Sequence, residues 1–94
     1  MLRNNRQTEL EELVLTEEEV IDIKNLIIYN DDFNTFDFVI DTLIEVCKHN
    51  PEQAEQCTFI IHYKGKCGVK RGTAQELQPV CDTLLERGLS AKIE

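Results

Sequence analysis

The stretch LIIYNDDFNTFDFVIDTLIEVC, residues 26–47, decides the fold, because a strand pattern changes there into a helix pattern across one polar loop. Residues 26–29 form a compact, β-prone apolar run, and the three residues after them favour turns. From Phe36 to Cys47, apolar side chains recur at i, i+3, i+4, i+7, i+8 and i+11, the spacing of one helix face. We expect Asn34 to cap this helix, with Asp37 completing an Asx variant of the capping box.

Two further helices follow from their start signals. Asn50 precedes Pro51 and Gln53, which predicts a capped helix that ends near His62-Tyr63. Thr73-Ala74-Gln75-Glu76 is a full capping box, and Gly88 suits the position that ends the helix it starts. We expect Ala54, Cys57, Thr58 and Ile61 on the inner face of the second helix, and Leu77, Val80, Cys81, Leu84 and Leu85 on that of the third.

The remaining segments predict two short strands, at residues 66–70 and 89–93. Strict alternation along the first of them would place Lys66 and Lys70 on one exposed face. The order strand, helix, helix, strand, helix, strand predicts an α+β fold of two layers, with a three-stranded sheet covered on one face by three helices. Residues 1–22 carry seven acidic and two basic side chains, and we expect a flexible acidic N-terminal extension before a core domain at 23–94.

Composition narrows the function classes. A length of 94 residues predicts one domain. The formal net charge of −8 disfavours nonspecific binding to nucleic acid or anionic membranes. Its apolar runs are far shorter than the roughly 20 residues of a membrane span, and residues 1–7 lack a secretory signal. We therefore expect a cytoplasmic monomer with reduced thiols. Its four cysteines form no C-x-x-C pair, which favours scattered thiols over a zinc site built with His49 or His62.

The sequence offers little for catalysis, since it contains no phosphate-binding loop, zinc-hydrolase motif or nucleophile elbow. We expect a protein that is not an enzyme and that needs no cofactor or metal. A metal-dependent enzyme using Asp31, Asp32 and His62 is the minor alternative, because a loop cap and a solvated carboxylate explain the two aspartates equally well. The only basic cluster either keeps an edge strand soluble or docks an acidic partner; it comprises Lys64, Lys66, Lys70 and Arg71.

Two segments together resemble one family. The first, NDDFNTFDFVID at residues 30–41, is followed by HYKGKCGV at residues 62–69, and the pair resembles ClpS, the adaptor of bacterial Clp proteases. The likeness runs from about Lys24 to Glu94. It implies an adaptor that binds the free N-terminal Leu, Phe, Tyr or Trp of N-degron proteins. The adaptor would deliver them to a ClpA- or ClpC-like AAA+ unfoldase and its ClpP peptidase.

The resemblance also implies the site. Asn30, Asp31 and His62 would meet the α-amino group, whose three donors require fixed acceptors. The basic cluster would be the unfoldase docking face. The side-chain pocket would be lined by Ile28, Asn34, Phe36, Val39, Thr58, Ile61 and Leu89, with Phe36 at the gate.

The chain departs from the family pattern at three of these places. It has Asn34-Thr35 where a small cap residue and proline are usual, Phe36 where methionine is common, and Thr58 where a larger apolar residue is common. A second reading keeps the architecture but changes the partner. In that reading the chain is an interaction module like the C-terminal domain of the ribosomal stalk protein, since a fold alone does not fix function.

Overall fold

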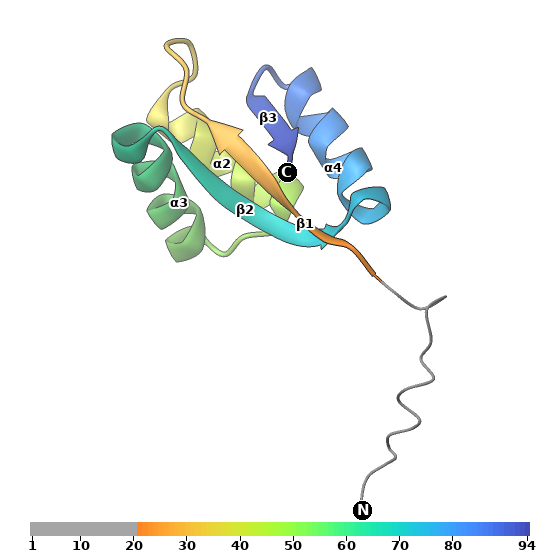
Figure 1. Cartoon of the computed structure of the whole chain (residues 1–94). Coiled ribbons are helices and arrows are strands. Elements are labelled where there is room, and N and C mark those ends of the chain that lie inside the picture. The colour runs from red at the N-terminus through yellow and green to blue at the C-terminus, as the bar shows by residue number, and fades with distance from the viewer. Residues whose placement is uncertain (1–20) are drawn as a thin grey trace, which may run out of the picture.

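The computed structural model describes residues 21–94, which form three strands and three helices (Figure 1). In chain order these are β1 (Ile23–Tyr29), α2 (Phe36–Cys47), α3 (Pro51–Lys64), β2 (Lys66–Thr73), α4 (Ala74–Glu86) and β3 (Ser90–Ile93). The predicted element order is confirmed. The predicted N-terminal extension, residues 1–22, falls almost wholly outside the described residues, and β1 begins at Ile23.

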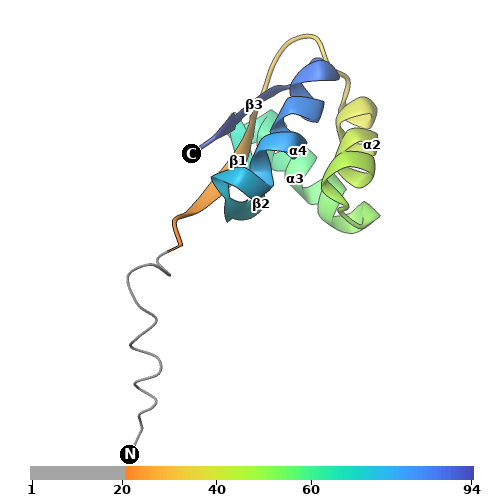
Figure 2. The ribbon, with the colours of Figure 1, turned by 90° about the vertical axis from the view of Figure 1, so that its right-hand side faces the viewer.

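The three strands form one antiparallel sheet in the order β2-β1-β3, so β1 lies in the middle. The helices lie together on one side of this sheet, as the turned view shows (Figure 2). Leu26 and Ile28 of β1 are buried at the centre of the core, with Leu43 of α2 and Leu77 and Leu84 of α4. The structure therefore confirms the α+β, two-layer prediction.

A β-bulge interrupts the pairing of β1 with β2. Leu26 pairs with Lys70 whereas Ile27 pairs with Gly68, so Val69 is an extra residue on β2. Such an insertion breaks the simple alternation of faces along the bulged strand. The face of the sheet on which each β2 side chain lies must therefore be read from its partner on β1.

The bulge makes the predicted common face of Lys66 and Lys70 wrong. Lys66 pairs with Tyr29, and its ammonium lies over the Tyr29 ring, 5.7 Å from the centroid. Lys70 instead pairs with the buried Leu26, on the helix-covered face. There its charge acts on the buried thiol of Cys47 and opposes the effect of burial on the pKa of that thiol.

His49 has a structural role that the sequence did not reveal. It follows the left-handed residue Lys48 that ends α2, and only 5% of its surface is exposed. Its Nε2 lies 2.7 Å from the carbonyl oxygen of Val69, so this nitrogen carries the proton and donates it. Within the described residues its Nδ1 is buried without a partner. His49 thus ties the α2–α3 connection to the bulge of β2.

The helix ends test the predicted caps. Asn50 caps α3 and Thr73 with Glu76 forms the capping box of α4, as predicted. The predicted Asn34 cap of α2 is wrong, because Thr35 holds that position and its Oγ1 accepts a hydrogen bond from the Phe38 N–H at 3.1 Å. Leu85 is also not on the inner face of α4, since it is 49% exposed. None of the helices in residues 21–94 is both long and apolar enough to cross a lipid bilayer.

Candidate functional site

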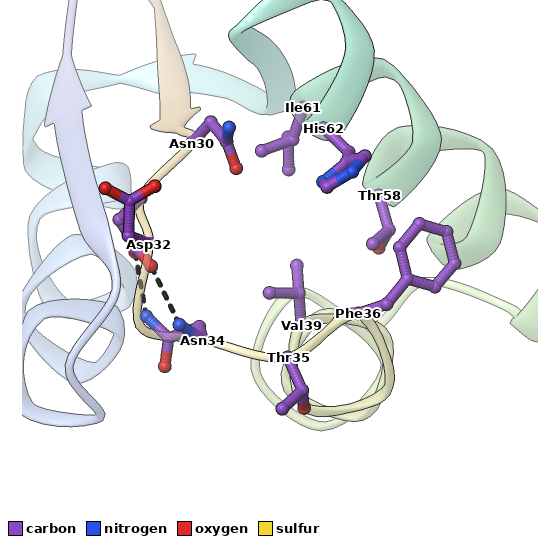
Figure 3. Close-up of a pocket in the computed structure, with 10 residues that line it drawn as sticks. Asn30, Asp32, Asn34, Thr35, Phe36, Val39, Thr58, Ile61 and His62 are labelled. Carbon is purple, nitrogen blue, oxygen red and sulfur yellow. Dashed lines mark hydrogen bonds between the residues drawn. The ribbon is translucent and has the colours of Figure 1, made fainter.

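A cavity of about 360 Å³ opens between the β1–α2 loop, the first turns of α2 and the second half of α3 (Figure 3). We call it the candidate pocket. Its size falls within the range of small-ligand sites, and it combines an apolar wall with a polar rim. It is lined by Asn30, Asp31, Asp32, Asn34, Thr35, Phe36, Val39, Thr58, Ile61 and His62.

Asp31 organises the loop that forms one edge of the candidate pocket. Its Oδ1 accepts hydrogen bonds from the backbone N–H groups of Phe33 at 2.9 Å and Asn34 at 2.8 Å. Its Oδ2 accepts a third hydrogen bond from the Asn34 side-chain amide at 2.8 Å. Partial burial raises the pKa of Asp31, but the hydrogen bonds from Asn34 and Phe33 outweigh it, so the pKa lies below its ordinary value.

Asn34 connects this loop to the far end of the chain. Besides its bond to Asp31, its side-chain amide donates to the carbonyl oxygen of Gly88 at 3.0 Å. Gly88 lies between α4 and β3 and has a φ of 90°, which glycine adopts without strain. The edge of the candidate pocket is therefore fixed from two distant parts of the sequence.

Asn30 and His62 supply the polar groups on the opposite part of the rim. The backbone N–H of Asn30 donates to the Gly65 carbonyl at 2.9 Å, which holds the end of β1 close to the end of α3. Figure 3 shows the Asn30 side chain pointing into the cavity, on the same side as His62. Both residues are exposed, so both can exchange bound water for a ligand.

The apolar wall comes from the inner faces of the two helices. Val39 of α2 and Ile61 of α3 are buried, and their side chains point towards each other across the cavity (Figure 3). Thr58 is also buried, and its hydroxyl donates to the Ala54 carbonyl at 2.7 Å. Because that bond satisfies the hydroxyl proton, Thr58 can present its methyl group to the wall.

Phe36 closes the side of the candidate pocket between α2 and α3. Its ring contacts the Phe59 ring edge to face, with centroids 4.8 Å apart and an interplanar angle of 68°. The His62 ring lies 6.2 Å from Phe36 and 5.0 Å from Tyr63, both edge to face. The Phe36 ring is turned towards α3 rather than across the cavity (Figure 3).

Most of the residues that the sequence pointed to lie together here. Ile28 and Leu89 are not among the lining residues and belong to the hydrophobic core, where they are 1% and 3% exposed. Sequence reasoning did not assign Asp32 and Thr35 to the lining. The signal that could have identified them is their position in the sequence, next to Asp31 and Phe36. The residues brought together as predicted are Asn30, Asp31, Asn34, Phe36, Val39, Thr58, Ile61 and His62.

None of the four residues of the predicted docking cluster is among those that line the candidate pocket. Lys64, Lys66 and Arg71 are exposed, whereas Lys70 is half-buried. Lys66, Lys70 and Arg71 belong to β2, which is an edge strand of the sheet. Arg71 follows the bulge and pairs with Asn25 of β1. The cluster therefore presents separate charges along one edge rather than a single face.

The cysteines do not form a metal site among residues 21–94, where no group of three or more His, Cys, Asp or Glu side chains is arranged to hold a metal ion. All four are free thiols. Burial raises the pKa of Cys47 to about 11, and burial together with the neighbouring Cys67 thiol raises that of Cys57 to about 12. These two thiols stay protonated at neutral pH and are poor nucleophiles.

Comparison with known proteins identifies relatives of this chain. A family model described as "ATP-dependent Clp protease adaptor protein ClpS" matches residues 24–92. The chain is 38% identical over 68 residues to a ClpS adapter protein of Nitratidesulfovibrio vulgaris, in an alignment that covers 68% of this chain and 64% of the relative. It is 34% identical over 79 residues to the ClpS adapter protein of Sodalis glossinidius, covering 76% of this chain and 74% of the relative. With the Salmonella gallinarum adapter the identity is 44% over 46 residues, which cover 47% of this chain and 43% of the relative.

The chain thus spans less than two thirds of the length of the Nitratidesulfovibrio and Salmonella relatives. The fold itself is similar to that of Agrobacterium tumefaciens ClpS2, whose structure was solved bound to L-phenylalaninamide. The TM-score is 0.68 at 18% identity, and the match covers 80% of this chain and 98% of ClpS2. Because the family model matches most of its length, the chain belongs to the ClpS family of ATP-dependent Clp protease adaptor proteins.

Proposed function

We propose that this chain is a non-catalytic adaptor that binds the free N-terminal residue of proteins beginning with Leu, Phe, Tyr or Trp. It then delivers them to a Clp AAA+ unfoldase and its peptidase. The observation that carries the proposal is the candidate pocket, a cavity of about 360 Å³ in which an apolar wall lies beside hydrogen-bond acceptors.

The polar rim suits an α-ammonium group. Such a group has three N–H donors and is costly to bury without acceptors. Asn30 offers an amide oxygen and His62 a ring nitrogen when its imidazole is neutral. The Asp31 carboxylate already accepts three hydrogen bonds, but two oxygens offer about four acceptor sites. Asp31 therefore contributes negative charge and one remaining acceptor.

The apolar wall suits the side chain that an N-terminal residue carries. Burying a Leu or Phe side chain between Val39 and Ile61 contributes about 1.5–3 kcal/mol. That amount alone gives only weak binding, and so does an ammonium held without the side chain. Selectivity for an N-terminal residue requires both halves of the candidate pocket at once.

The ClpS2 ligand supports this assignment by its chemistry. L-phenylalaninamide carries a free amine, a phenylalanine side chain and a neutral carboxamide, so it resembles the first residue of a peptide. In this chain the same three parts would meet the acceptors, the cavity and the solvent-facing rim. The exposed Lys64, Lys66 and Arg71 would contribute to docking on an acidic surface of the unfoldase. We expect this assembly in the cytoplasm.

Binding of peptides that differ only at the N-terminus tests the proposal. A fluorescent peptide that begins with Leu should bind, and the same peptide with an acetylated α-amine should bind at least tenfold more weakly, because acetylation removes the charge and two donors. His62→Ala should weaken the free-amine peptide and leave the acetylated one unchanged. Lys92→Ala, an exposed change on β3, is the matched control. Equal affinity for both peptides would show that the amine is not recognised.

A further inference from the structure

A row of aromatic side chains runs along the outer surface of α3 next to the candidate pocket. Phe59 contacts the Phe36 ring at 4.8 Å and stacks on Tyr63, with ring centroids 5.8 Å apart and planes inclined by 12°. Phe59 is 43% exposed and Tyr63 is 73% exposed. Side chains this exposed add little to the core, so their arrangement calls for another explanation.

We propose that Phe59 is a positioning residue that keeps the candidate pocket open by holding the Phe36 ring against α3. Tyr63 stacks on Phe59, and the His62 ring lies edge to face with both Tyr63 and Phe36, so Phe59 belongs to a group of four rings beside the candidate pocket. This inference rests on the proposed function only for the identity of the ligand. The role of Phe59 in holding the ring can be measured without any ligand.

The position of Phe36 makes such a support necessary. It is the first residue of α2, so no preceding helical turn restricts its χ1 angle. The cavity beside it has an apolar wall formed by Val39 and Ile61. Without Phe59, the Phe36 ring would keep only the more distant edge-to-face contact with His62, at 6.2 Å. It would then gain by covering itself in that cavity, since apolar surface leaves water wherever a space accepts it.

Self-occlusion has a defined consequence for binding. A phenyl ring inside a cavity of about 360 Å³ would take the space that the ligand side chain needs. Large first residues such as Trp and Phe would lose more affinity than Leu. Phe59 would then set the range of accepted residues while it touches none of them.

Methyl NMR of the ligand-free protein tests the support directly. In Phe59→Ala the Val39 and Ile61 methyl resonances should move upfield, because the Phe36 ring then lies over them. The shift should be absent in the double variant Phe36→Ala/Phe59→Ala. Ile60→Ala, the neighbouring exposed residue on α3, is the matched control and should leave the methyl signals in place. Unchanged Val39 and Ile61 signals in folded Phe59→Ala would overturn the proposal.

Peptide binding gives the second measurement. Phe59→Ala should weaken a Phe-initiated peptide roughly two- to tenfold, the range that corresponds to the loss of one aromatic pair, and should weaken a Leu-initiated peptide less. Phe59→Tyr should restore wild-type affinity, and Phe59→Leu should not, because only the former keeps the ring. In a Phe36→Ala background, Phe59→Ala should have no further effect.

The two measurements separate the two hypotheses. If Phe59→Ala still weakens binding without Phe36, then Phe59 acts on the peptide itself and the positioning role is wrong. If wild-type protein binds neither peptide, the proposed function fails, while the methyl shifts still decide whether Phe59 holds the Phe36 ring.

Discussion

Asp31 shows how one side chain serves the loop and the ligand site together. Its carboxylate fixes the backbone at Phe33 and Asn34 and orients the Asn34 amide, which in turn reaches Gly88. The neighbouring Asp32 is exposed and makes no comparable contribution to the loop. The two adjacent carboxylates therefore divide as the sequence alone suggested, into one that caps the loop and one that faces solvent.

The lowered pKa of Asp31 predicts a pH dependence of stability. A carboxyl group whose pKa is lower in the folded state stabilises that state above its unfolded pKa and loses the effect as the pH falls through the folded value. With an ordinary pKa of 3.8, Asp31 should stabilise the fold above about pH 4 and stop doing so at more acidic pH. Asp31→Asn should therefore unfold at lower temperature than wild type at pH 6, and the difference should shrink by pH 3.

Thermal unfolding of both proteins between pH 6 and pH 3 measures this difference. Asp41→Asn, an exposed carboxylate on α2, controls for the general effect of removing one negative charge. A gap between wild type and Asp31→Asn that stays constant down to pH 3 would show that the charge of Asp31 does not hold the loop.

At the residue scale, the sequence predicted which residues lie at the candidate site better than it predicted what each of them does there. The resemblance to ClpS brought Asn30 and His62 together although 32 positions separate them in the chain, and the structure places both at the rim of the candidate pocket. Depth was not predictable. Ile28 and Leu89 are buried in the core and do not line the cavity, and only the packing of the helices on the sheet decides which apolar residue reaches the wall.

At the scale of elements, the start of α2 shows the limit of local reasoning. Asn34 and Thr35 are both good N-cap residues, and the sequence does not say which one takes the position. The choice depends on the Asn34 amide, which bonds to the Gly88 carbonyl 54 positions away. The hydrogen bond to Gly88 holds the Asn34 side chain away from the cap position, so Thr35 caps α2 and Phe36 is the first residue of the helix.

The Thr35 cap gives a prediction for this element. Thr35→Ala removes the acceptor of the Phe38 N–H and should lower the free energy of unfolding by about 0.5–2 kcal/mol. Thr35→Ser keeps the hydroxyl and should recover most of the loss. Urea unfolding measures the change. If Thr35→Ala were as stable as wild type while Asn34→Ala lost helix stability, the cap would have to be reassigned to Asn34.

The bulge in β2 is a second feature that the sequence hides. One extra residue, Val69, moves Lys70 to the helix-covered face. The His49 ring donates a hydrogen bond to the carbonyl oxygen of Val69. A basic cluster that alternation would make continuous is thereby divided. The consequence for docking is that Lys66 and Arg71, rather than all four basic residues, share the outer face of the sheet edge.

At the scale of the whole molecule, the order and type of the elements followed from the sequence because each has a strong local signal. The capping box of α4, the cap and proline at the start of α3 and the apolar stripe of α2 each mark their element locally. Strand order is different, since β1 pairs with both β2 and β3 and these pairings are long-range. The central place of β1 became certain only from the structure, although its apolar composition agrees with it.

The separation of the candidate pocket from the N-terminal segment gives the last prediction, which distinguishes peptide binding from delivery. Among residues 21–94, every residue that lines the candidate pocket lies in the range from Asn30 to His62, and β1 begins at Ile23. Deletion of residues 1–20 therefore leaves the sheet intact and should keep peptide affinity within about twofold, less than about 0.4 kcal/mol. The deleted segment carries six acidic and two basic side chains, and we propose that the unfoldase pulls on the adaptor through it. Degradation of a Leu-initiated substrate by the cognate unfoldase and peptidase should consequently slow in the truncated protein. Loss of peptide binding would place the segment in the pocket, and degradation at the full rate would show that delivery does not use it.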